Sequence, residues 1–152
     1  MKVHLCFALL LLIANTAWAG KTSLVENREL SLGGVAIGDT EASVLRRLGP
    51  PVRRIDAGDA LGTQLDYAGL TVWLGDERRV VELLSVSKRH CTPSGVCPGM
   101  SLAQMKKKYG QPLAVFREDG AFMEYPSSGS SCWLQFAVDE DRIMSVRVEC
   151  QP

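Results

Sequence analysis

The chain has 152 residues, with 17 basic and 17 acidic side chains and a formal net charge of zero. This length suits one ordinary domain. The balanced charge argues against a nucleic-acid partner, because domains that bind nucleic acids carry a basic patch or stripe.

Residues 1–19 predict a secretory signal peptide. Lys2 supplies a positive start, residues 5–13 form an apolar run, and Ala17-Trp18-Ala19 fits an A-x-A cleavage site. A membrane-spanning helix needs roughly 20 apolar residues, so this run is too short to be an anchor. Cleavage after Ala19 leaves 152 − 19 = 133 residues, which we expect to be periplasmic or secreted, with no transmembrane segment.

One stretch of sequence occurs twice, at residues 34–51 and again at 95–112, with an offset of 61. Self-similarity at a fixed period is the signature of an internal repeat. The identical pairs are Gly34/Gly95, Val35/Val96, Gly38/Gly99, Ala42/Ala103, Gly49/Gly110 and Pro51/Pro112.

Each copy predicts a two-turn helix with its own start and stop. Thr40 and Ser101 precede short amphipathic runs, where a hydroxyl can accept from free helix N–H groups, and Ser101 with Gln104 fits a capping box. Gly49 and Gly110 are expected as left-handed C-terminal caps, each followed two residues later by a proline. Helices this short are marginal alone and must pack against something else.

The remaining chain predicts antiparallel strands separated by turn residues. Residues 20–29 are polar and expected to be loosely ordered, and 30–35 predict a short strand. The other expected strands are 52–56, 64–67, 70–74 and 80–87 after the first helix, and 113–117, 122–125, 132–138 and 143–150 after the second.

The predicted fold class is therefore α+β. We expect one domain, residues 20–152, made of two tandem helix-plus-antiparallel-meander repeats at about 30–88 and 89–152. The two units are expected to form a two-layer domain with both helices on one face of the sheet.

Four cysteines follow the signal peptide, and an even number in an exported protein predicts two disulfides. Strand alternation places Cys132 on the apolar face of one strand and Met144 and Cys150 on the apolar face of the next. Folding this hairpin about its acidic turn favours a Cys132–Cys150 bond, which leaves Cys91 to pair with Cys97. The two crossed pairings remain open alternatives.

The pattern Gly-x-[Ser/Thr]-x-x-x-apolar-x-x-x-[Leu/Tyr]-Gly-x-Pro, followed by a strand, a tyrosine and a hairpin, is found in both copies. It resembles the helix-plus-meander unit of the superfamily that contains the β-lactamase-inhibitor proteins and the SmpA/OmlA-type outer-membrane lipoproteins. The resemblance covers residues 34–150. The duplication is similar to the inhibitor branch, whereas the chain lacks the lipid-acceptor cysteine of the lipoprotein branch.

The titratable residues give little support for catalysis or metal binding. His90 is the one histidine after the signal peptide, and cysteines paired as disulfides do not ligate metals. The acidic groups Asp76-Glu77 and Asp139-Glu140-Asp141 fall in predicted hairpin turns, where solvated carboxylates are the simpler explanation. We therefore expect no enzyme, no cofactor and no metal.

The most informative candidates for binding lie on one predicted sheet face. Strand alternation places Trp133, Gln135, Ser145, Arg147 and Glu149 opposite the apolar face, and Trp73 extends this group from an earlier strand. A tryptophan with arginine and polar neighbours is typical of protein-binding surfaces. The alternative is that Trp133 packs against the first unit or the N-terminal segment.

The loop closed by Cys91 and Cys97 is the second candidate. Its exposed positions would be Pro93 and Ser94, and a disulfide-closed loop loses little entropy when it inserts into a partner. The alternative is that the disulfide only stabilises the fold.

These observations predict an exported binding protein whose partner is another envelope protein. The leading hypothesis is an inhibitor or immunity-type protein acting on an envelope enzyme, such as a cell-wall hydrolase or β-lactamase. The second is a periplasmic structural or assembly factor of the outer membrane or cell wall, and the sequence does not separate the two.

Overall fold

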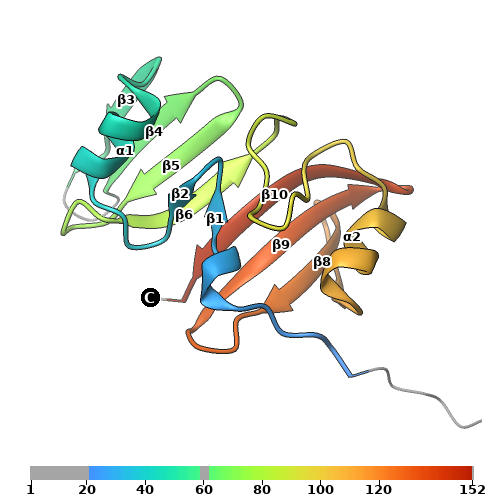
Figure 1. Ribbon diagram of the computed structural model, residues 1–152. Helices are drawn as coiled ribbons and strands as arrows, with labels where there is room; N and C mark the ends of the chain where they lie inside the picture. Colours follow the sequence, from blue (N-terminus) through green and yellow to red (C-terminus); the bar gives the residue numbers. More distant parts are fainter. Residues whose placement is uncertain (1–20, 59–61, 152) are drawn as a thin grey trace, which may run out of the picture.

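The computed structural model describes residues 21–58 and 62–151 (Figure 1). The predicted signal peptide, residues 1–19, lies outside the described residues. Within the described part of the chain, no helix is long and apolar enough to cross a membrane.

An eight-stranded antiparallel sheet forms most of the molecule, so the fold is of the α+β type at this level of description. The spatial order is β3-β4-β5-β6-β10-β9-β8-β7, so β6 lies against β10 at the centre. The strands are β3 (Arg53–Asp56), β4 (Thr63–Tyr67), β5 (Leu70–Leu74), β6 (Val80–Ser85), β7 (Leu113–Arg117), β8 (Gly120–Pro126), β9 (Cys132–Asp139) and β10 (Arg142–Cys150).

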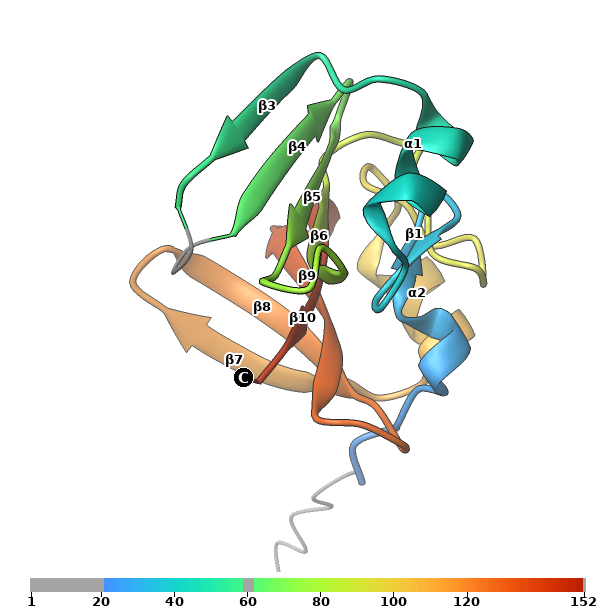
Figure 2. The same ribbon diagram turned by 90° about the vertical axis from the view of Figure 1, so that its left-hand side faces the viewer.

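The two helices, α1 (Glu41–Leu48) and α2 (Leu102–Tyr109), lie on the same side of this sheet (Figure 2). The short elements η1 (Asn27–Glu29), β1 (Ser31–Leu32) and β2 (Val35–Ala36) lie on that side as well, with β1 and β2 paired to each other. The strands near both edges bend away from the helices in Figure 2, which leaves the opposite face concave. We call this opposite face the helix-free face.

Both helices begin as their sequences predict. The Thr40 hydroxyl accepts from the Ser43 N–H at 3.2 Å, and the Ser101 hydroxyl accepts from the Gln104 N–H at the same distance. The Gln104 side chain in turn accepts from the Ser101 N–H at 2.9 Å, which completes the predicted capping box.

The helix ends differ in detail from the expected left-handed caps. Gly49 has φ 79° and ψ −166°, and Gly110 has φ 81° and ψ −148°. The positive φ was predicted, but the ψ values belong to an extended region that is essentially restricted to glycine. The chain therefore leaves each helix in an extended direction, toward the edge strand that follows.

A tyrosine hydroxyl ties each helix end to the sheet. Tyr67 on β4 donates to the Gly49 carbonyl at 3.2 Å, and Tyr125 on β8 donates to the Gly110 carbonyl at 2.9 Å. Burial raises the pKa of both phenols, so each stays a neutral donor. A carbonyl that the helix itself leaves unpaired is satisfied in both places.

Two β-bulges shift the pattern of inward residues. Ile143 is 1% exposed and Met144 is 55% exposed, because the pairing of β10 with β9 shifts between Ile143 and Ser145. The prediction that Met144 faces the core was wrong for this reason. The pairing of β6 with β5 shifts in the same way, which buries Val80 and exposes Val81.

The N-terminal segment is ordered, contrary to the expectation for residues 20–29. The Ser23 N–H donates to the Gln111 carbonyl at 2.8 Å, and Val25 forms a bridge with Ser127. Val25 and Glu29 are buried. Because Glu29 is charged and most of its neighbours are polar, the sequence of this segment gave no sign that it is packed.

Replacing the two cap glycines with alanine should destabilise the protein unequally. The positive φ with extended ψ predicts a loss of about 1–3 kcal/mol in the free energy of unfolding for each variant. Gly110→Ala should lose more, because its Cβ would lie 2.4 Å from Ser23 Oγ, whereas a Cβ at Gly49 meets nothing within 4 Å. Denaturant midpoints measure both effects, and valine should be worse than alanine at either site.

A Ser23→Gly substitution is the control for this comparison. It should narrow the gap between the two alanine variants, because it removes the atom that the new Cβ meets. A Gly49→Ala midpoint equal to that of the unaltered protein would contradict the assigned backbone conformation.

Candidate functional site: a cleft on the helix-free face

The sheet register aligns four side chains in one row across the centre of the helix-free face. Trp73 on β5 lies opposite Glu82 on β6, Glu82 lies opposite Glu149 on β10, and Glu149 lies opposite Trp133 on β9. Two carboxylates are thus flanked by two indoles. Arg147 lies two residues from Glu149 along β10, so it is on the same face, and it lies opposite Gln135.

A cleft of about 380 Å³ opens on this face. Its lining includes all five residues that strand alternation predicted: Trp133, Gln135, Ser145, Arg147 and Glu149. Sequence reasoning missed three further residues of the lining, from β7, β8 and the turn between them: Arg117, Asp119 and Phe122.

Both arginines of the cleft are already paired with carboxylates. Arg147 Nη1 lies 2.5 Å from Glu82 Oε1, and Arg117 Nη2 lies 2.7 Å from Glu124 Oε1. The Gln135 side-chain amide donates to the same Glu124 oxygen at 2.9 Å. Gln135 is only 8% exposed, so it supports the cleft wall rather than presenting its amide to solvent.

Burial raises the pKa of Glu82, and the charge of Glu149 raises it further, while Arg147 opposes both effects. The cross-strand pair of carboxylates is therefore an unfavourable arrangement that one arginine only partly offsets.

Trp133 is half-buried, and its Nε1 is shielded from solvent without a hydrogen-bond partner among the described residues. A shielded N–H without an acceptor costs about 1–3 kcal/mol. Trp133 therefore keeps part of its ring exposed on the cleft while its donor is left unsatisfied. Trp73 is also half-buried, on the same face but outside the cleft lining.

The disulfides join Cys91 to Cys97 and Cys132 to Cys150, which is the pairing favoured from the sequence. In the smaller loop Pro93 is exposed.

Ser94 differs from the expectation of a free loop residue. Its N–H and hydroxyl both donate to the Glu29 carboxylate, at 3.2 and 2.9 Å. Ser94 therefore anchors the loop to the N-terminal segment and is a poor contact for a partner.

The Glu29 carboxylate also accepts from the Tyr109 hydroxyl at 2.6 Å, and the oxygen of the same hydroxyl lies 2.6 Å from the Thr92 hydroxyl oxygen. Because a phenol has one proton, Tyr109 donates to Glu29 and accepts from Thr92. Burial, with the charge of Glu29, raises the pKa of Tyr109. This buried network joins η1, the disulfide loop and α2.

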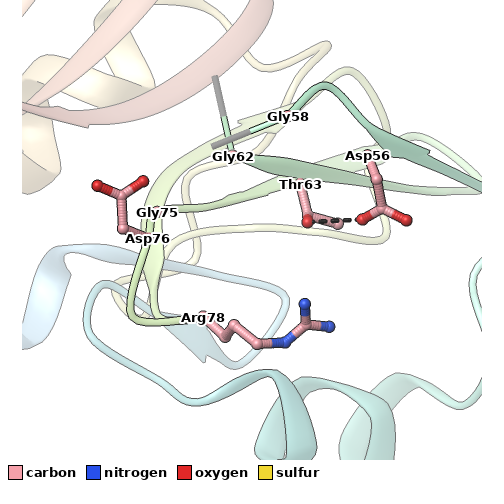
Figure 3. Close-up of a pocket in the computed structure, with 7 residues that line it drawn as sticks. All are labelled: Asp56, Gly58, Gly62, Thr63, Gly75, Asp76 and Arg78. Atoms are coloured by element: carbon pink, nitrogen blue, oxygen red, sulfur yellow. Dashed lines mark hydrogen bonds between the residues drawn. The ribbon is translucent and has the colours of Figure 1, made fainter. Parts of the chain in front are cut away.

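A second, larger cleft of about 560 Å³ lies between the loops that follow β3 and β5 (Figure 3). Asp56 accepts from the Thr63 hydroxyl at 2.7 Å and pairs with Arg54 at 2.9 Å, while Arg78 pairs with Glu41. Figure 3 shows the Asp76 carboxylate directed away from Asp56 and Arg78. The charged groups of this second cleft are therefore either far from one another or already paired. The cleft also adjoins residues 59–61, which lie outside the described part of the chain.

No cluster of three or more His, Cys, Asp or Glu side chains suited to a metal ion occurs within residues 21–58 and 62–151. His90 Nε2 lies 3.2 Å from the Ala68 carbonyl, and both cysteines of its neighbouring loop are bonded to each other. The basic run Lys106–Lys108 is exposed along α2.

No family model matches the chain, and no curated protein matches it by sequence. Among solved structures, the chain is similar to an extracellular protein containing an SCP domain from Bacillus anthracis, with a TM-score of 0.56 and 16% identity over 87% of this chain and 49% of that one. A DUF4309 family protein, YjgB, from Bacillus subtilis has a TM-score of 0.55 and 15% identity, over 78% and 83% of the two chains. A cysteine-rich secretory protein from Staphylococcus aureus has a TM-score of 0.53 and 10% identity, over 86% and 50%.

These identities show a shared fold and no more. The chain spans about half the length of the Bacillus anthracis and Staphylococcus aureus proteins. Two disulfides are typical of proteins in oxidising compartments outside the cytosol, and two of the three neighbours are described as extracellular or secretory. An extracytoplasmic location is consistent with both observations.

Removing the buried carboxylate of Glu29 should destabilise the fold without touching the cleft. Glu29→Ala leaves the Tyr109 hydroxyl and the Ser94 donors without their acceptor, so we expect a loss of about 2–3 kcal/mol in the free energy of unfolding. The matched control is Glu26→Ala, three residues earlier, which removes a carboxylate that pairs with Arg28 on the surface. This variant should change stability by less than about 1 kcal/mol. Similar denaturant midpoints for the two variants would show that the network is not a structural anchor.

Proposed function

We propose that this chain is an exported protein-binding module that recognises another envelope protein through the cleft on its helix-free face. The observation that carries this proposal is the convergence of Trp133, Arg147 and Glu149 in one open cleft on the face that neither helix covers. Aromatic and arginine side chains at the centre of a patch, with a polar rim, are the usual composition of a protein interface.

The partner we propose is an envelope enzyme, such as a cell-wall hydrolase or a β-lactamase, and the action is inhibition or immunity by surface complementarity. This proposal needs no chemistry from the chain itself. Nucleophilic catalysis needs a base within hydrogen-bond reach of the nucleophile. Within residues 21–58 and 62–151 the only histidine, His90, lies 3.2 Å from a backbone carbonyl and the cysteines are paired with each other, which supports a binding role over a catalytic one.

We also propose that the chain descends from a duplicated helix-plus-meander unit and belongs to the superfamily that its motifs resemble. Equivalent hydrogen bonds in the two halves support this. Besides the two tyrosine bonds to the helix ends, Arg79 donates to the Gly38 carbonyl at 2.9 Å, and Arg142 donates to the Gly99 carbonyl at 3.0 Å. The resemblance makes inhibition the favoured form of binding, but the cleft would serve an assembly factor equally well.

Truncating the central aromatic residue should abolish capture of the partner. In a pull-down from envelope extract, Trp133→Ala should lose about 2 kcal/mol or more of binding free energy, which is roughly a thirtyfold loss of affinity. The matched control is Phe116→Ala, which removes a 78% exposed aromatic ring that does not line the cleft. It should leave capture unchanged.

The competing hypothesis is that the disulfide loop, residues 91–97, binds the partner. If Pro93→Ala abolishes capture and Trp133→Ala does not, the loop is the binding site. Ser94 is unsuitable for this test, because its substitution would also break the bond to Glu29. The identity of the captured protein then separates an inhibitor of an enzyme from an assembly factor, and thermal melts of each variant check that it is folded.

A further inference from the structure

The cleft and its margin carry an excess of negative charge. Its two cations, Arg117 and Arg147, face four carboxylates in and beside the cleft: Glu82, Glu124, Asp119 and Glu149. Glu82 forms an ion pair with Arg147, and Glu124 forms one with Arg117. Within residues 21–58 and 62–151, neither Glu149 nor Asp119 forms an ion pair, so two carboxylates are left over.

The register separates these two carboxylates along the cleft. Glu149 lies opposite Trp133, whereas Asp119 belongs to the turn before β8, whose residue Phe122 lies opposite Ala137. Ala137 lies four residues along β9 from Trp133, which is roughly 13 Å. The two left-over carboxylates therefore lie toward opposite ends of the cleft, and each lies near one arginine that is already paired with a glutamate.

The Glu149 end also offers aromatic surface. Trp133 and Trp73 flank the two carboxylates in the same cross-strand row. An indole face attracts a cation, and the effect is larger when the site is partly desolvated. The other end of the cleft already shows this type of contact, because the Arg117 guanidinium lies 5.0 Å from the centre of the Phe122 ring.

We propose that the Trp133–Glu149 end of the cleft receives a lysine or arginine side chain that a loop of the partner protein presents. The inference rests on the proposed function and names the chemistry of that partner. The cation would be held by Glu149 against the Trp133 ring, and it would relieve the repulsion between Glu149 and Glu82.

An acidic occupant fits the same cleft poorly. Arg147 and Arg117, the two groups that could hold an anion, would first have to give up Glu82 and Glu124 at 2.5 and 2.7 Å. An anion would then lie beside four carboxylates. Like charges brought together at an interface suppress the wrong partner.

Defined peptides test this preference without knowledge of the partner. The probes are acetyl-Gly-Ser-X-Ser-Gly-amide with X as lysine, arginine, norleucine or glutamate, and calcium chloride alone is a further arm. Binding is followed by the indole N–H resonance of Trp133 in the exported protein, assigned with the help of a Trp73→Phe variant. The lysine and arginine peptides should shift this resonance with at least about fivefold higher affinity than norleucine, and glutamate should have no effect.

Two variants separate a binding role of Glu149 from a structural one. Glu149→Gln should weaken the affinity for the lysine peptide about fivefold. It should also raise the thermal midpoint, because it removes the negative charge that lies opposite Glu82. The matched control is Glu118→Gln, an exposed acid in the turn between β7 and β8 that does not line the cleft, and it should change neither quantity. A structural role would instead make Glu149→Gln less stable.

Each remaining result overturns the proposal. Equal binding of the lysine and norleucine peptides, binding of the glutamate peptide, or a response to calcium but to no peptide would show that the cleft does not select a basic side chain. Failure of all the peptides at millimolar concentration would show the same. If Trp133→Ala still abolishes capture of an envelope protein in that case, the binding role of the face stands and only the basic preference is lost.

Discussion

The antiparallel pairing of β6 with β10 is the contact on which the architecture depends. These strands are more than fifty residues apart in sequence, yet Leu83 lies opposite Val148 and Ser85 lies opposite Val146. All four are buried, and their pairing joins two four-stranded meanders into one sheet. Because side chains alternate between faces, a slip of one residue would expose this core and bury the charged row of the helix-free face. The hydrophobic pattern thus fixes the geometry of the cleft.

Much of this architecture follows from local sequence signals. Thr40 and Ser101 mark the helix starts, and Gly49 and Gly110 mark the ends, because each performs a task that few residue types can perform. The strands between turn residues were placed within a few residues. The order of the strands could not be predicted in this way, because no local sequence signal indicates that β6 pairs with β10. The prediction of one shared sheet rested on the absence of a linker between the two halves.

The errors have specific physical causes. A β-bulge adds one residue to a strand without any change in composition, so simple alternation placed Met144 on the core face, where the structure has Ile143. Ser94 looked like an exposed loop residue because its acceptor, Glu29, lies 65 residues away in sequence. In the same way, Phe122 and Asp119 joined the cleft only through the register of β8 with β9, which alternation within a single strand cannot reveal.

The distribution of paired and unpaired polar groups favours the helix-free face over the disulfide loop as the proposed binding site. At the helix ends and in the disulfide loop, Ser101, Tyr125 and Ser94 each find their hydrogen-bond partners within the fold. On the helix-free face, Glu82 and Glu149 oppose each other, and Trp133 Nε1 has no acceptor among the described residues. Stability alone would favour a neutral residue in place of one glutamate, and this local conflict is the kind that proteins retain at functional sites. In the disulfide loop Ser94 is already paired with Glu29, whereas on the helix-free face Glu82 and Glu149 repel each other, so a cationic group from a partner would gain more at the proposed site than at the loop.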